Sequence, residues 1–244
     1  MIRAPIPGLS EGERALDGAV GHYLARVLRL KAGSEFVAFD PASGREADAI
    51  VTRADGDGLA VCFGATREGR ALPARSLTWI QGFAKGDKCD AVVRDATELG
   101  ATRVVIAATR RSVVRLDDGR AAARLARWTR IAEEASRQCG RSEAPIVEGP
   151  MLWDDALGRV DASDARFCLS VPAPEPLAPL LFEALARGPG LAFACGPEGG
   201  LDDAEIEGAA TQGWQPASLG PLALRTETVA AAVLGAVRVW TGLF

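Results

Sequence analysis

Two hydrophobic patterns divide the chain. Up to residue 70, apolar and polar residues alternate over short runs between Gly, Asp and Pro, which is typical of β-strands. Strands are predicted at Glu35–Asp40, Glu46–Arg53 and Leu59–Phe63, after a short helix at Gly21–Leu30. Such a series of short strands favours a small β-barrel domain over residues 1–70, with Gly64–Arg75 as a linker.

From Ser76 onward, strand and helix patterns alternate. Strands are predicted at Leu77–Gln81, Val104–Ala107, Phe167–Ser170, Leu191–Ala194 and Pro216–Ser218. Helices are predicted between and after them, at Lys85–Leu99, Arg120–Cys139, Trp153–Val160, Leu177–Arg187, Asp202–Gln212 and Thr226–Trp240. This alternation favours a parallel sheet with helices on both faces, so we predict an α/β domain over residues 76–244.

Two loops stand out where strands of this second domain should end. The first, GPEGG at residues 196–200, directly follows an apolar strand, and glycine lets a ligand approach the backbone closely there. The second, LGPLALRTET at residues 219–228, leads into a helix, with Thr226 and Thr228 suited to its N-cap and Glu227 to its first turn. Taken alone, the first loop fits an ordinary strand-to-helix turn equally well.

Composition restricts the chemistry that these loops can serve. The single histidine, His22, excludes HExxH zinc sites and multi-His metal sites. No lysine precedes Ser or Thr and no GxGxxG is present, which disfavours P-loop and dinucleotide sites. Five scattered cysteines and the lack of an N-terminal apolar signal segment predict a reduced, cytoplasmic protein. The longest apolar stretch, Val229–Val237, is too short to span a membrane.

The net charge of −4 conceals an uneven distribution along the chain. Residues 1–75 sum to 0, residues 76–150 to +3 and residues 151–244 to −7. Ten arginines stand against four acidic residues within Arg103–Arg141. An arginine-rich helix is more often a solvated face than a binding site, so this density alone does not indicate a nucleic-acid partner.

Four segments, in order, carry a resemblance to a known family. They are HYLARVLRLKAGSEF, DAVVRDATELGATRVVIAATRRSVVR, RWTRIAEEASRQCGR and CGPEGGLDDAEIEGAATQGWQPASLGPLALRTETVAAA. Together they resemble the SPOUT-class methyltransferases that modify uridine N3 in small-subunit (16S) ribosomal RNA. The resemblance extends over most of the chain. It implies a PUA-like barrel followed by a SPOUT domain with a deep trefoil knot near the C-terminus.

The same resemblance implies a cofactor and partners. S-adenosylmethionine is expected in the knot, held by Gly196, Pro197, Glu198, Gly199, Gly200, Leu219, Gly220, Leu224, Thr226 and Thr228. The expected partners are 16S ribosomal RNA, or the small ribosomal subunit, and a second copy of the chain bound through the knot region. The Val229–Val239 helix agrees with a dimer, because a helix that is apolar on every side must be buried. No metal is expected.

The chemistry of such a transfer suggests roles for three residues. The sulfonium methyl is already electrophilic, so the enzyme must align the reactants and manage one proton of uracil N3. Arg225 is predicted to stabilise the uracil anion, and Glu198 or Glu227 to accept the proton. Alternatives stay open, because Arg225 fits a salt bridge at the helix start and both carboxylates fit a role in binding backbone amides.

Clustered guanidinium groups suit RNA phosphates and unpaired bases. The predicted RNA contacts are Arg3, His22, Arg26, Arg29, Arg110, Arg111, Arg137, Gln138 and Arg141. The chain departs from the family at Leu222, where an arginine is usual, at Arg94-Asp95, where Gln-Lys is frequent, and at Leu201, where phenylalanine is usual. Two other functions stay open: a SPOUT methyltransferase acting on ribose 2′-OH or transfer RNA, and a noncatalytic RNA-binding assembly factor.

Overall fold

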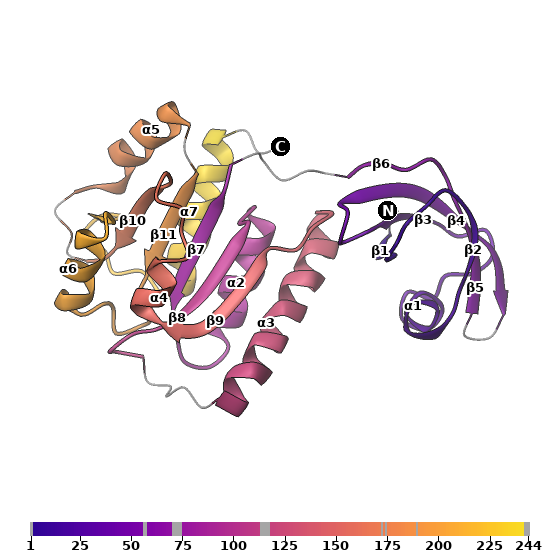
Figure 1. Cartoon of the computed structure of the whole chain (residues 1–244), viewed down its shortest axis with the longest axis horizontal. Helices are drawn as coiled ribbons and strands as arrows, with labels where there is room; N and C mark the ends of the chain where they lie inside the picture. The colour runs from indigo at the N-terminus through magenta and orange to yellow at the C-terminus, as the bar shows by residue number, and fades with distance from the viewer. Residues whose placement is uncertain are drawn as a thin grey trace. The chain divides into compact units, whose positions relative to one another are not determined.

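The chain folds into two compact units (Figure 1). The computed structural model describes residues 2–55, 58–69, 75–112, 118–171, 173, 175–188 and 190–241. The first unit combines Met1–Ala71 with Ser136–Ala144, and the second combines Leu72–Ala135 with Pro145–Phe244. Part of the predicted Gly64–Arg75 linker, residues 70–74, lies outside the described residues.

The first unit is a mostly antiparallel sheet. Its strands are β1 (Arg3–Pro5), β2 (Gly12–Leu16), β3 (Glu35–Phe39), β4 (Arg45–Asp55), β5 (Gly58–Phe63) and β6 (Arg67–Glu68). They lie in the order β1-β3-β4-β5-β2, with β6 paired to β4 and only β1 and β3 parallel among the described strands. Alternate residues of β5 (Leu59, Val61 and Phe63) are buried in one core with Leu24 and Phe36. The three strands predicted from this alternation are confirmed.

The helix of the first unit begins earlier and ends earlier than predicted. It consists of α1 (Gly18–His22) and a π-helical continuation, η1 (Tyr23–Val27). Arg29 follows in the left-handed region at φ 55°, and the amide of Leu30 donates to the carbonyl of Leu24 at 3.0 Å. This turn ends the helix and buries Leu30 in the core.

The second unit contains a parallel sheet whose central strands are buried on both faces. The strands are β7 (Leu77–Gly82), β8 (Arg103–Ala108), β9 (Ile146–Leu152), β10 (Ala165–Leu169), β11 (Leu191–Cys195) and β12 (Gln215–Ala217). They lie in the order β12-β10-β11-β7-β8-β9. Adjacent side chains of β7 alternate between two cores, so that Trp79 packs on one face and Ile80 on the other. The predicted α/β fold is confirmed.

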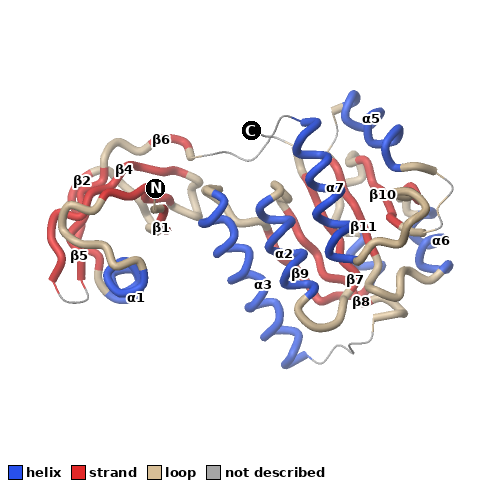
Figure 2. The backbone as a smooth tube through the Cα atoms, turned by 180° about the vertical axis from the view of Figure 1, so that it is seen from behind, coloured by secondary structure: helices blue, strands red, loops and turns tan. Residues whose placement is uncertain are grey.

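Helices cover both faces of this sheet. They are α2 (Lys88–Glu98), α3 (Asp118–Cys139), α4 (Trp153–Leu157), α5 (Leu177–Arg187), α6 (Asp203–Thr211) and α7 (Thr226–Thr241). One core contains side chains of α2, α3, α5 and α7, and the opposite core contains those of α4 and α6. Figure 2 shows α2, α3 and α7 together in front of the sheet. Within the described residues, no helix has the length and apolar content needed to cross a membrane.

In the second unit, the helices predicted at Lys85–Leu99 and Trp153–Val160 are shorter in the structure, and one strand, β9, was missed. The helix predicted from Lys85 begins at Lys88, after Gly86 in the left-handed region at φ 66°, and the helix predicted to Val160 ends at Leu157. Strand β9 was missed because Gly149-Pro150 interrupts its pattern. At the edge of a sheet proline is tolerated, and a Cβ on Gly149 would lie 2.2 Å from the Ile106 carbonyl oxygen.

Candidate functional site

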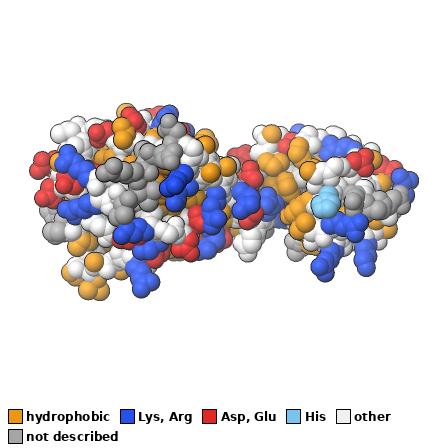
Figure 3. All heavy atoms as spheres, turned by 90° about the horizontal axis from the view of Figure 1, so that it is seen from below, with side chains coloured by type: hydrophobic (Ala, Val, Ile, Leu, Met, Phe, Trp, Pro, Cys, Tyr) orange, Lys and Arg blue, Asp and Glu red, His pale blue; other side chains and the backbone are white. Residues whose placement is uncertain are grey.

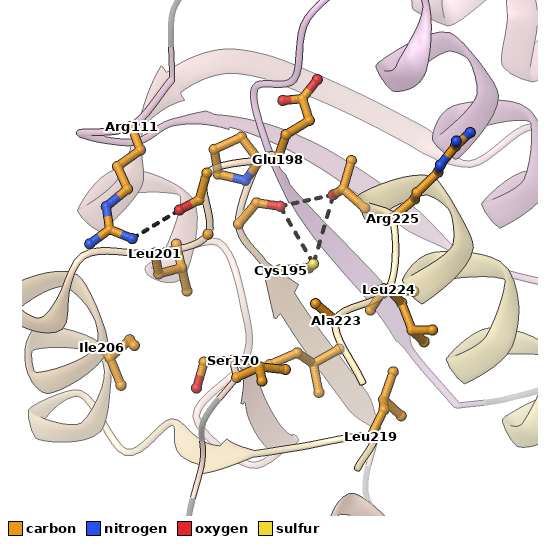
Figure 4. A pocket seen from close by; sticks show the side chains of 18 of the residues that line it. Arg111, Ser170, Cys195, Glu198, Leu201, Ile206, Leu219, Ala223, Leu224 and Arg225 are labelled. Atoms are coloured by element: carbon orange, nitrogen blue, oxygen red, sulfur yellow. Dashed lines mark hydrogen bonds between the residues drawn. The ribbon is translucent and has the colours of Figure 1, made fainter. Parts of the chain in front are cut away.

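The two glycine-containing loops meet around one cavity at the carboxyl ends of β10, β11 and β12 (Figure 4). The cavity has a volume of about 690 Å³. We call residues 196–200 the GPEGG loop and residues 218–225 the α7 loop. The lining residues from these two loops are Gly196, Pro197, Glu198, Gly199, Gly200, Leu219, Leu222, Ala223, Leu224 and Arg225. Both loops to which the resemblance assigned the cofactor therefore line the same cavity.

Backbone packing explains the glycines of the GPEGG loop. The Gly200 amide donates to the Pro197 carbonyl at 2.9 Å, and Gly200 has φ 71°. A Cβ on Gly196 would lie 2.7 Å from the carbonyl carbon of Gly200. A Cβ on Gly82, at the end of β7, would lie 2.6 Å from the Pro197 nitrogen. The loop can therefore close on itself and on β7 only without side chains at these positions.

A capping box holds the other end of the GPEGG loop. Asp202 accepts from the Ala204 amide at 3.0 Å, and Glu205 accepts from the Asp202 amide at 2.9 Å. The second oxygen of Glu205 accepts from the Arg110 amide at 2.7 Å. The loop after β8 is therefore tied to the start of α6 beside the cavity.

Arg110 and Arg111, both predicted to contact RNA, lie next to the GPEGG loop. Arg110 pairs with Asp202 at 3.3 Å. Arg111 donates to the Gly199 carbonyl at 2.9 Å and lines the cavity (Figure 4). Both guanidinium groups are exposed and lie within reach of a substrate that approaches the cavity from solvent.

Glu198 is held at the N-terminal end of α2. Its Oε1 accepts from the Lys85 amide at 3.1 Å and pairs with the Lys88 ammonium at 3.0 Å. Partial burial by itself raises the pKa of Glu198, but hydrogen bonds from its own backbone, Lys88 and Lys85 outweigh it and lower the pKa from its usual value. A carboxylate stabilised in this way is a weak base, which favours the alternative that Glu198 holds the loop.

Arg225 and Glu227 take different positions at the start of α7. Arg225 is exposed at the cavity, and in Figure 4 its guanidinium points away from Cys195. Glu227 is half-buried, and its Oε2 is buried without a hydrogen-bond partner in the described structure. Glu227, Gly220 and Thr228 are not among the residues that line the cavity. These three predicted site residues therefore lie beside the cavity rather than in its wall.

Cysteine chemistry is disfavoured in this cavity. Cys195 lines its wall, and burial raises the pKa of the Cys195 thiol to about 11. The thiol is thus protonated at neutral pH and donates to the Gly196 carbonyl at 3.5 Å. Within the described residues, no group of His, Cys, Asp and Glu side chains could hold a metal ion.

Five of the predicted RNA contacts lie in the helical part of the first unit and in the Ser136–Ala144 segment that belongs to it. His22, Arg26 and Arg29 are exposed there, and the guanidinium of Arg137 lies 5.9 Å from the centre of the Tyr23 ring. Gln138 is exposed. On the face shown in Figure 3, Lys and Arg side chains lie at the surface of each unit.

Two other predicted RNA contacts have intramolecular roles in this unit. Arg3 pairs with Glu46 at 2.9 Å, and its guanidinium lies 5.5 Å from the centre of the Phe39 ring. Arg141 is buried, and this burial lowers the pKa of its guanidinium to about 10. Neither side chain presents an open guanidinium at the described surface.

Sequence reasoning missed several residues of the site. Lys88, Ser170 and Val171 line the cavity from segments that no motif singled out, and Ile206 lies within the last motif but was not named as a site residue. Gln81 does not line the cavity, but it is fully buried near the end of β7 and bonds both the GPEGG loop and Thr226. The sequence feature that could have identified Gln81 is its position as a polar residue at the end of an apolar strand.

Comparison with known proteins gives consistent matches over nearly the whole chain. A family model described as an RNA methyltransferase domain matches residues 71–238, and an RNA methyltransferase PUA domain matches residues 16–71. Ribosomal RNA small subunit methyltransferase E of Bacillus subtilis (strain 168) is 32% identical, covering 94% of this chain and 91% of its own. The protein of that name from Mycobacterium tuberculosis is also 32% identical, covering 93% and 86%.

A solved structure agrees with these matches. The ribosomal RNA small subunit methyltransferase E of Neisseria gonorrhoeae, bound to S-adenosyl methionine, superposes with a TM-score of 0.86. It is 27% identical, and the match covers 98% of both chains. The similarity therefore extends through both units and includes the loops around the cavity.

Proposed function

The chain belongs to the RNA methyltransferase family of these relatives, and from this premise we propose that it methylates uridine N3 in small-subunit ribosomal RNA with S-adenosylmethionine. One observation carries the proposal. The two loops that resemble the family's signature line a single cavity at the carboxyl edge of a parallel sheet, where α/β proteins bind ligands. We also propose that residues 1–70 serve RNA binding, residues 76–244 serve catalysis, and the protein acts in the cytoplasm.

The cavity suits a nucleoside-containing cofactor. Its volume of about 690 Å³ lies within the usual range for small-molecule sites. Apolar side chains of Leu169, Ile206, Leu219 and Leu224 offer surfaces for a flat base, and the glycines of the GPEGG loop leave its backbone accessible. The GPEGG loop and the α7 loop would therefore hold the cofactor, which supplies an electrophilic methyl group when bound.

The protein's own task is then to place the uracil and remove one proton. Arg225 is proposed to stabilise negative charge on the uracil oxygens, because it is an exposed residue that lines the cavity and carries a guanidinium group. Between the two carboxylates, Glu198 is committed to Lys85 and Lys88, whereas Glu227 keeps one oxygen without a partner. Glu227 is therefore the less committed carboxylate, but it lies beside the cavity rather than in its wall, so both remain candidates for the proton acceptor.

RNA binding is proposed for basic and polar residues of both units. In the first unit they are the exposed His22, Arg26, Arg29 and Gln138 and the half-buried Arg137, and beside the cavity they are Arg110 and Arg111. Arg3 and Arg141 are left out because the first is paired with Glu46 and the second is buried. The substrate proposed is 16S ribosomal RNA, free or in the small subunit.

The knotted path and the dimer are part of the same proposal. Exposed apolar side chains at the C-terminal end of α7 support a subunit contact, because Val239 is 68% and Trp240 is 44% exposed. The buried side of α7 is filled by Ala230, Val233 and Leu234. The helix thus keeps an apolar surface beyond the one that packs in its own core.

Mass spectrometry of ribosomal RNA from a deletion strain tests the activity. Loss of N3-methyluridine from small-subunit RNA, and its return with the wild-type gene, is the expected result. Persistence of that mark with loss of a ribose 2′-methyl group, or of a transfer-RNA mark, would instead assign another substrate. Calorimetric titration with S-adenosylmethionine tests the noncatalytic alternative, an RNA-binding assembly factor that has lost cofactor binding, since such a chain would bind none.

A further inference from the structure

Gln81 is a fully buried polar side chain that bonds two residues of the cavity lining, Gly196 and Thr226. It stands near the carboxyl end of β7, where its Nε2 donates to the carbonyls of Gly82 at 3.0 Å and Gly196 at 3.2 Å. The same nitrogen lies 2.7 Å from the Thr226 hydroxyl oxygen, so its two N–H hydrogens are shared among three acceptors. Its Oε1 accepts from the Trp79 indole at 3.2 Å. Buried polar groups have no water to bond, so each of these partners would lose free energy if it moved away from the amide. The Gln81 amide therefore holds the surrounding groups in place.

The partners of Gln81 belong to both cofactor loops. Thr226 is 4% exposed and donates from its hydroxyl to the Gly196 carbonyl at 2.8 Å. Gly196 begins the GPEGG loop, and Thr226 follows the α7 loop directly, as the first residue of α7. Figure 4 shows this contact as a dashed line beside Cys195. One buried network therefore joins the ends of β7 and β11 to the start of α7.

Close backbone packing surrounds the network. A Cβ on Gly82 would lie 2.8 Å from the Gly196 carbonyl carbon, so β7 and the GPEGG loop touch without an intervening side chain. The hydroxyl of Thr226 is used inside this network. Its place near the cavity thus reflects the joining of two loops rather than a hydroxyl offered to a ligand.

We propose that Gln81 and Thr226 are positioning residues that hold the GPEGG loop and the α7 loop at the separation that S-adenosylmethionine requires. The inference rests on the proposed function for the identity of the ligand. It also changes the role expected of Thr226, from direct contact with the cofactor to support of the loops that contact it. Loss of either side chain should loosen both loops together, although they are far apart in sequence.

Matched variants of threonine test the network. Thr226→Val keeps the shape of the side chain and removes the hydroxyl, whereas Thr226→Ser keeps the hydroxyl. Thr97→Val is the control, because Thr97 is also fully buried and its hydroxyl donates to the Val93 carbonyl within α2. We expect Thr226→Val and Gln81→Leu to raise the dissociation constant for S-adenosylmethionine about tenfold, and the other two variants to leave it unchanged.

A second variant separates a polar network from simple packing. In Gln81→Glu a protonated carboxyl can still donate one hydrogen bond, whereas a carboxylate would face the carbonyl oxygens of Gly82 and Gly196. Cofactor affinity of this variant should therefore fall as the pH rises, while the wild type shows no such loss. A side chain needed only for its volume would give the same pH profile in both proteins.

Hydrogen exchange without cofactor makes the test independent of the proposed function. Amides of residues 196–201 and 225–229 should exchange faster in Thr226→Val and Gln81→Leu than in Thr97→Val of similar thermal stability. Wild-type affinity together with unchanged exchange in both variants would overturn the inference. A wild type that binds no S-adenosylmethionine would overturn the proposed function, and the exchange rates would then decide the loop network alone.

Discussion

Glu198 illustrates how a single side chain of the site is set by its neighbours. The Lys85 amide and the Lys88 ammonium both contact the same carboxylate oxygen. The sequence offered this residue as a proton acceptor, because a carboxylate in a glycine-containing loop suits that role. Its contacts instead favour an ionised group that links the GPEGG loop to the start of α2.

The lowered pKa of Glu198 gives a pH-dependent contribution to stability. A carboxyl group whose folded pKa lies below its unfolded value stabilises the folded state above the unfolded pKa. That contribution is lost as the pH falls through the folded pKa. Lys88→Ala should therefore destabilise the protein at pH 7, by about 0.5 kcal/mol because the pair is partly exposed, and much less at pH 3.

Urea unfolding at the two pH values measures this difference. Glu134→Gln is a matched control, because the Arg130–Glu134 pair is longer, at 3.8 Å, and lies on the exposed side of α3. Equal destabilisation by Lys88→Ala at both pH values would show that the ion pair contributes nothing.

Arg225 gives a prediction about catalysis. Its guanidinium is exposed and is proposed to act on the uracil, so Arg225→Ala should lower the turnover number about 100-fold or more. Affinity for S-adenosylmethionine should change little, because the contact proposed is with the substrate. Arg187→Ala, an exposed arginine at the end of α5, is the control for loss of a surface charge. Methyl-transfer assays that show wild-type turnover would remove Arg225 from the mechanism.

At the scale of elements, the site depends on how closely the ends of β7 and β11 approach. Gln81 of β7 is paired with Cys195 of the neighbouring parallel strand β11. After Cys195 the chain enters the GPEGG loop, whose first residues, Gly196 and Pro197, pack directly against Gly82 at the end of β7. The three segments at this edge, from β7, β11 and α7, are fixed by backbone packing and by the buried network. The cavity is therefore a property of the sheet edge rather than of one loop.

A methyl group at Gly82 should separate these elements. The added Cβ would lie 2.6 Å from the Pro197 nitrogen, and the backbone atoms there cannot rotate out of the way. Gly82→Ala is expected to cost about 1–3 kcal/mol in unfolding free energy and to abolish tight binding of S-adenosylmethionine. Gly208→Ala in α6 is the matched control, because a Cβ there meets nothing within 4 Å and should stabilise the helix by about 0.5–1 kcal/mol.

Denaturant unfolding and calorimetric titration of both glycine variants check this pair. Opposite signs of the stability change are expected, with cofactor affinity preserved only in Gly208→Ala. Normal affinity in Gly82→Ala would mean that the GPEGG loop moves away from β7 without consequence for the cavity.

At the scale of the whole molecule, the sequence predicted those parts of the fold whose pattern is local. The central strands β7, β8, β10 and β11 were found because they are buried on both faces and read as continuous apolar runs. The edge strand β9 was missed because Gly149-Pro150 breaks its run. In the first unit, β1 and β6 were missed because they are only 3 and 2 residues long, and β2 was missed because its sequence GERAL shows no apolar alternation. The division into two kinds of domain followed from the change of period at Ser76.

Only the parts of the site that lie in recognisable sequence motifs could be predicted. Both loops were found from their glycines and threonines, but Lys88, Arg111 and Ser170 reach the cavity from other strands and helices. Their proximity depends on strand order, which brings β7 between β11 and β8 and is not visible in local pattern. The burial of Arg141 was equally hidden, because an arginine in a basic motif has the same sequence signal whether it faces solvent or a core.

The C-terminal end of α7 exposes large apolar side chains. Val239 is 68% exposed, and next to it Trp240 stacks on Phe182 with ring centres 4.3 Å apart, so the second unit presents an apolar surface there. If a second copy covers this surface, a carboxylate introduced on it would be buried without a partner, and the two subunits should separate. Val239→Asp should therefore shift the protein from dimer to monomer, as measured by sedimentation at micromolar concentration.

Val27→Asp provides the comparison, because Val27 is 61% exposed in the first unit and lies in η1. This variant should keep the oligomeric state of the wild type, since the subunit interface is proposed for α7 alone. A monomeric wild type, or a dimer that survives Val239→Asp, would exclude the C-terminal end of α7 as the interface. Loss of methyl transfer together with the dimer would show that the cavity needs the second subunit to be complete.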